Sequence, residues 1–205
     1  MRIDRNLNLV IPLEREDGPI YIHSTPISRE VFERYYLVIA KTFASIHQEG
    51  LTVIAGPRVS YLMLRDIAQK SGSWDGPGGV QAGLINEMRR LTNVVMPGER
   101  GWHVVPFQNA IDREMLDDEE VAEAEGAIVF FTCVVAMHRK AVAMAMVDGL
   151  NDLWGTRTTS SNSTEFAGSL PTSTATETSA EAGVALVPST GRSNGTGRAA
   201  SSLPS

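Results

Sequence analysis

Four histidines and one cysteine have the side chains with the widest chemical range in this sequence, because imidazole and thiolate groups serve as bases, nucleophiles and metal ligands. The histidines are far apart in the chain, at His23, His47, His103 and His138. The sequence contains neither an H-E-x-x-H motif nor the Cys/His spacing of a zinc site. Cys133 lies within an apolar run, so we expect a small core residue in a protein of a reducing cytoplasm.

Two other stretches could do chemistry through charge or through backbone groups. Residues 117–120 are all acidic and could bind a divalent cation, but consecutive side chains on a helix point in different directions. Asp117 and Glu120 instead have the spacing of a capping box, where the helix dipole favours negative charge. The glycine-rich loop at residues 75–79 precedes a predicted helix and could hold an anion, but it lacks a lysine and fits an ordinary turn.

The remaining catalytic motifs are missing from the sequence. It has no G-x-S-x-G nucleophile elbow and no phosphate-binding G-x-x-x-x-G-K-[ST] loop. We therefore predict no catalytic, cofactor-binding or metal-binding residues, no cofactor, and a protein that is not an enzyme. The net charge of −6 over 205 residues argues against a nucleic-acid binder, which would show a basic patch.

The longest apolar run, residues 127–137, raises the question of a membrane span. Eleven helical residues rise about 16 Å, roughly half of a bilayer core. With basic residues directly after it, this run predicts a buried core helix and no membrane association. The apolar residues in and after this run could either fill the core or form a soft partner-binding face, and core filling is the commoner case; they are Phe130, Phe131, Val134, Met137, Met144 and Met146.

The elements that must position these groups follow from periodicity and turn signals. Residues 7–23 predict a β-hairpin around an Asp-Gly turn. Pro12 cannot donate a ladder hydrogen bond, which puts the first strand at an edge or at a bulge. A helix is predicted from Thr25 or Ser28 to Gly50. Its apolar residues form one stripe at helical spacing: Phe32, Tyr35, Tyr36, Ile39, Phe43 and Ile46.

Further helices are predicted along the rest of the chain. One begins at Pro57 and ends near Gly72, a second covers residues 80–92, and a short one covers 106–116. The stretch at 102–105 is too short to assign. Residues 117–154 predict either one long helix or two, with the change of direction at residues 138–140.

The last 51 residues, 155–205, have a different composition. They contain ten threonines and eleven serines with few large apolar side chains, so they cannot bury enough surface to offset the entropy of ordering. We therefore predict a mainly α-helical single domain over residues 1–154, with a small N-terminal β-hairpin, followed by a disordered Ser/Thr-rich tail over residues 155–205.

Three segments resemble a known family. They are the first 43 residues, MRIDRNLNLVIPLEREDGPIYIHSTPISREVFERYYLVIAKTF, the segment TNVVMPG at 92–98, and LWGTRTTSSNSTEFAGSLPTST at 153–174. These segments look like the tail assembly chaperones of long-tailed bacteriophages and prophages. The likeness contains no catalytic signature, and no functional residue can be placed by motif.

The resemblance implies a function without catalysis. Such chaperones are small, largely helical proteins of the host cytoplasm that coat the long, apolar, helical tape measure protein before the tail tube polymerises. The implied partners are the tape measure protein and the tail tube protein, and the chaperone is not expected in the mature virion. The alternative is a structural virion protein, such as a head–tail joining or tail completion component. The sequence leaves the oligomeric state open, a homo-oligomer included.

Overall fold

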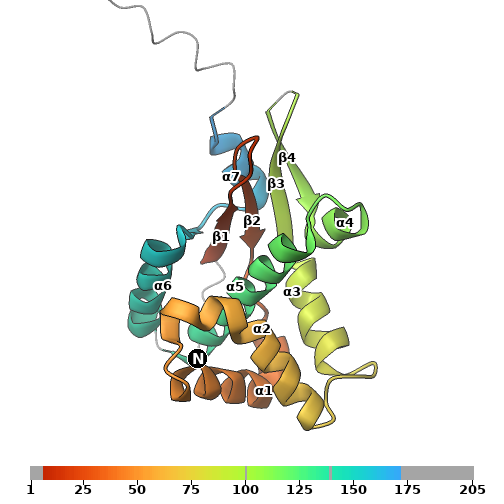
Figure 1. Ribbon diagram of the computed structural model, residues 1–205, viewed down its shortest axis with the longest axis vertical. Helices are drawn as coiled ribbons and strands as arrows, with labels where there is room; N and C mark the ends of the chain where they lie inside the picture. Colours follow the sequence, from red (N-terminus) through yellow and green to blue (C-terminus); the bar gives the residue numbers. More distant parts are fainter. Residues whose placement is uncertain (1–6, 100, 139, 172–205) are drawn as a thin grey trace, which may run out of the picture. The chain divides into compact units, whose positions relative to one another are not determined.

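The computed structural model describes residues 7–99, 101–138 and 140–171, and it contains a five-stranded antiparallel sheet (Figure 1). The strand order is β4-β3-β2-β1-β5, and every neighbouring pair is antiparallel. The strands are β1 (Asn8–Leu13), β2 (Ile20–Ser24), β3 (Thr92–Gly98), β4 (Gly101–Pro106) and β5 (Arg157–Thr159).

Helices alternate with strands along the chain: one group of helices follows β2, a second follows β4, and one more helix follows β5. They are α1 (Arg29–Gln48), α2 (Thr52–Lys70), the π-helical turn η1 (Gln81–Ile85), α3 (Asn86–Arg90), α4 (Phe107–Asp112), α5 (Asp118–Met137), α6 (Lys140–Trp154) and α7 (Ser163–Ser169). The prediction of a mainly helical domain with one small hairpin is therefore wrong. The sheet joins strands that lie far apart in the sequence. β5 has only three residues, too few to show a period-2 pattern, and β3 and β4 do not alternate regularly between buried and exposed residues.

Alternation along β1 places apolar side chains on both faces of the sheet. Leu9, Ile11 and Leu13 belong to the large core beneath the helices, whereas Val10 belongs to a smaller cluster on the other face. That smaller cluster includes Phe166 of α7, so α7 covers the face opposite the helical layer. β5 and α7 both lie in the segment expected to be a disordered tail, while residues 172–205 lie outside the described residues.

Helix α5 is the centre of the helical layer and packs against α1, α2, α6 and β1. Its apolar run is buried on all sides from residue 127 to residue 134, which confirms the prediction of a core helix. The contact with α2 is very close at Gly126, where an added Cβ would lie 2.1 Å from the Pro57 carbonyl oxygen. Ser60 Oγ donates a hydrogen bond of 2.5 Å to the carbonyl of Gly126.

The beginning of α2 differs from the prediction in an informative way. The helix starts at Thr52, and Pro57 lies inside it rather than at its first turn. A proline inside a helix leaves the carbonyl four residues earlier without its usual donor. That carbonyl belongs to Val53, and Trp154 Nε1 of α6 donates to it at 2.8 Å. A side chain 101 positions away thus replaces the missing bond.

The predicted hairpin is confirmed, because β1 pairs with β2. β1 is not an edge strand, since it lies between β2 and β5, but Pro12 lies beyond the part of β1 that pairs with β5. Ser28 caps α1 by accepting from the Val31 N–H, and Asp117 with Glu120 forms the capping box of α5. The region after Asp117 consists of two helices that separate at His138.

Candidate functional site

An apolar stripe on the outer side of α1 is the first part of the candidate site. Phe32, Tyr36 and Ala40 follow one another at intervals of four residues and therefore share a face of the helix. The predicted single stripe has the correct period but only part of it is buried. The residues that α1 buries are Tyr35, Val38, Ile39, Thr42 and Ile46. Tyr36, a member of the predicted stripe, is 56% exposed.

The C-terminal end of α5 forms the opposite wall. Ala136 and Met137 belong to the last turn before His138, whose extended backbone ends the helix. Met137 is 37% exposed, although Ala136 is buried. Together the two helices line an open groove whose residues are Phe32, Glu33, Tyr36, Ala40, Ala136 and Met137.

The chemistry of this groove is that of apolar contact. The alanines leave depth between the helices, and Phe32, Tyr36 and Met137 supply large side chains beside it. Glu33 is the single ionised group among the lining residues, and Arg29 pairs with it at 2.6 Å. Apolar grooves between helices are a common way to bind the apolar face of a partner helix. Methionine adapts to partners of different shape because its side chain is unbranched and flexible.

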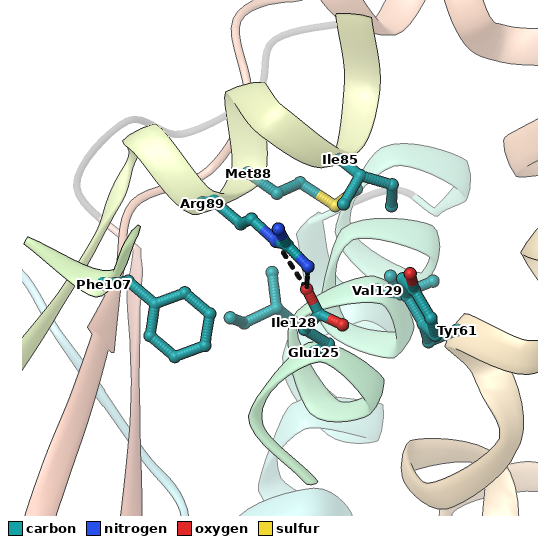
Figure 2. A pocket seen from close by; sticks show the side chains of 8 residues that line it. All are labelled: Tyr61, Ile85, Met88, Arg89, Phe107, Glu125, Ile128 and Val129. Carbon is teal, nitrogen blue, oxygen red and sulfur yellow. Dashed lines mark hydrogen bonds and ion pairs between the residues drawn. The ribbon is translucent and has the colours of Figure 1, made fainter. Parts of the chain in front are cut away.

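A second pocket lies at the other end of α5 and is shown in Figure 2. Glu125 points from α5 toward Arg89 of α3, and Arg89 Nη2 lies 2.6 Å from Glu125 Oε1. Arg89 also donates to Gln108 Oε1 at 3.3 Å. The other lining residues are Tyr61, Ile85, Met88, Phe107, Ile128 and Val129.

This pocket is small, and mainly apolar side chains surround its one ion pair. Its free space is about 10 Å³, roughly the room that one water molecule needs. Burial raises the pKa of Glu125, and the nearby Arg89 charge opposes that shift. Burial, followed by the Glu125 charge, also raises the pKa of Tyr61. The pocket therefore holds a structural ion pair that joins α3 to α5 and leaves no room for a substrate.

Sequence reasoning missed both Glu125 and Arg89. The signal at Glu125 is a carboxylate placed directly before a long apolar run, where a partner is required. Its partner is 36 positions away, so only the tertiary structure reveals the pair.

The structure does not gather the four histidines into one place. His47 and His138 both pack against the ring of Phe43, with centroid distances of 4.3 and 4.9 Å. His23 is buried under α7, with its ring 6.0 Å from that of Phe166, and His103 is exposed on β4. In the part of the chain that is described, no group of three or more His, Cys, Asp or Glu residues could hold a metal ion.

Helix-start electrostatics account for the acidic run. Asp117 Oδ1 accepts from the Glu120 N–H at 2.8 Å, and Glu120 Oε2 accepts from the Asp117 N–H at 2.9 Å. Arg15 of the β1–β2 loop pairs with Glu120, and this hydrogen bond lowers the pKa of that carboxyl group.

The glycine-rich loop is an ordinary turn. The N–H groups at its end and at the start of the following helix already have acceptors, because Gly79, Val80 and Gln81 donate to the carbonyls of Gly76, Ser73 and Trp74. The loop is also held by Tyr35, whose hydroxyl lies 3.2 Å from the carbonyl of Gly78.

Cys133 is a core residue, as predicted. It is 1% exposed, and burial raises the pKa of its thiol to about 12. None of the helices in the described ranges has both the length and the apolar character that crossing a bilayer requires.

Comparison with known proteins adds no relative to this picture. No protein-family model matches the chain, and no curated protein or solved structure matches it either.

Proposed function

We propose that this protein is a non-enzymatic phage tail assembly chaperone that binds an apolar helical segment of the tape measure protein and recruits tail tube subunits. The observation that supports the proposal is the groove between α1 and the end of α5, which leaves Tyr36 and Met137 in water. An amphipathic helix could place its i, i+3, i+4 and i+7 side chains along such a groove. The family identity itself rests on the sequence resemblance.

The proposal can be tested with peptides from the tape measure protein encoded in the same genome. Fluorescence anisotropy of labelled helical peptides should show saturable binding to the full chain. Tyr36→Ser should weaken that binding at least tenfold, because it removes the largest exposed ring of the groove. Leu62→Ser is a matched control, since Leu62 is 59% exposed on α2 and does not line the groove.

Equal affinity of wild type and Tyr36→Ser would exclude the groove as the binding site. An absence of binding to every tape measure peptide would contradict the chaperone function. The alternative, a structural virion component, has a separate readout. Mass spectrometry of lysate and purified virions should find the chaperone in the lysate and not in the virion, whereas a fixed copy number in virions would favour the alternative.

A further inference from the structure

β4 is an edge strand whose outward backbone groups are identified by the ladder pattern. The Thr25 N–H donates to the Leu91 carbonyl at 3.0 Å, which fixes the alternation of hydrogen-bonded pairs between β2 and β3. Val94 and Met96 of β3 consequently bond toward β4, and their partners are Val105 and His103. The N–H and C=O groups of Trp102 and Val104 therefore point away from the sheet.

These outward groups have no backbone partner among the described residues. Natural edge strands are usually protected by charged side chains, bulges or proline. Residues 101–106 contain no Asp, Glu, Lys or Arg, and Pro106 stands at the very end of the strand. The His103 ring packs where a Cβ of Gly98 would lie, so it leans over the hairpin rather than across the edge.

We propose that β4 pairs with β4 of a second copy of this chain in an antiparallel, two-fold symmetric ladder centred on His103. In this register Trp102 of one copy lies opposite Val104 of the other, and each pair exchanges both N–H···O=C bonds. Pro106 takes no part in these bonds, so its missing N–H costs nothing. The two sheets then form one continuous sheet.

Side chains agree with the same register. Trp102 and Val104 pack with the cluster on the α7 face, and Trp102 is held by its Nε1–H, which donates to the Pro171 carbonyl at 3.0 Å. Pairing brings Trp102 beside the second copy's Val104, and aromatic–β-branched neighbours of this kind stabilise sheets. The uncharged strand also avoids like-charge repulsion at the two-fold axis, although each chain carries a net charge of −6. A different protein would need to supply this complementarity, whereas a second copy already has it.

The register can be tested by disulfide trapping in the full chain. His103→Cys places two thiols opposite each other in a non-hydrogen-bonded pair, where Cα atoms are about 4.5 Å apart, which is within disulfide range. Native Cys133 is 1% exposed and does not compete. Glu99→Cys at the hairpin tip is the control, because the same register separates the two copies of residue 99 by about 26 Å.

We expect rapid, nearly complete disulfide dimer formation for His103→Cys under mild oxidation and little for Glu99→Cys. Equal crosslinking of the two variants, or none with either, would overturn the proposed register. Sedimentation velocity of the wild type should show dimer at about 100 µM, and a monomer at that concentration would overturn the dimer itself.

Val104→Pro provides an independent test. It deletes an outward N–H and leaves the ladder with β3 intact, so we expect a monomer with an unchanged far-UV circular dichroism spectrum. Leu62→Ser should remain a dimer, because Leu62 lies on α2 in the helical layer. A Val104→Pro dimer, or a monomeric Leu62→Ser, would place the interface elsewhere.

Discussion

The two ends of α5 differ in what they bury and what they expose: a charged pair is buried near its beginning, and apolar side chains are exposed at its last turn. Near its beginning, Glu125 brings a carboxylate into the core, and Arg89 and Gln108 complete a closed polar network. At its last turn, Ala136 and Met137 face an open apolar groove together with α1. A buried polar group costs free energy unless it has a hydrogen-bond or ionic partner inside the protein. Exposed apolar side chains have no such requirement and can instead bind another molecule.

This contrast predicts that the two ends of α5 have different roles, one in the stability of the fold and the other in the binding of a partner. Changes near the closed end of α5 should alter the free energy of unfolding, and changes at the open end should alter affinity with little effect on folding. Four predictions test that division, beginning with the largest effect.

Gly126→Ala should cost about 3 kcal/mol in the free energy of unfolding, because its Cβ would lie 2.1 Å from the Pro57 carbonyl oxygen. That oxygen belongs to the backbone, so α2 would have to move. Urea denaturation measures the change. Gly149→Ala in α6 is the control, since its Cβ would make ordinary contact with Val53 at 3.8 Å and should stabilise the helix by about 0.5–1 kcal/mol. A stable Gly126→Ala protein would show that the α2–α5 contact can relax.

Glu125→Ala should cost about 2–4 kcal/mol, because it leaves the Arg89 charge half-buried without its carboxylate. The same denaturation experiment applies. Asp66→Ala removes the partner of Lys70 from an exposed pair and should cost less than about 1 kcal/mol. Similar values for the two variants would mean that water reaches the Arg89–Glu125 pair and that the pocket is not closed.

His23 is a second buried polar group, and like Glu125 it has a partner inside the protein. Its Nε2 lies 2.9 Å from the Ser161 carbonyl, and burial lowers its pKa below the usual 6.5. The unfolded chain therefore binds this proton more readily than the folded chain. Stability should fall as the pH drops through about 6.5, and the loss is complete once the pH is below the folded pKa.

Thermal unfolding between pH 7.5 and 5 measures this effect. His23→Gln should make the melting temperature less dependent on pH over that interval, although the variant itself should be less stable. Leu62→Ser is the control and should leave the dependence unchanged, because Leu62 does not titrate and is 59% exposed on α2. An identical slope for wild type and His23→Gln would assign the acid sensitivity to another group.

Tyr36→Ser should have the smallest effect on folding, within about 0.5 kcal/mol, because the side chain is already 56% exposed. The same substitution should have the large effect on peptide binding described above. A substantial loss of stability would show that Tyr36 supports the fold, and the division between the two ends of α5 would then fail.

Features that depend on neighbours in the chain could be predicted from the sequence. Short-range spacing predicted the hairpin at residues 7–23, a helix start at Thr25 or Ser28, the capping box at Asp117 and a core helix at 127–137. Local spacing also predicted the period of the α1 stripe. It did not predict which part of that stripe would be covered, and Tyr36, one of its members, is exposed.

Features that join distant segments depend on the three-dimensional fold and could not be predicted from the sequence. β5 is three residues long and gains its stability from pairing with β1, which lies about 150 positions earlier. Pro57 is tolerated inside α2 because Trp154 donates to the carbonyl that the proline leaves free. The Arg89–Glu125 pair and the groove at Met137 arise in the same way, where helices from different parts of the chain meet α5. Such contacts depend on which segments lie close together in space. The spacing of apolar residues along the chain reports only local secondary structure and does not reveal those contacts.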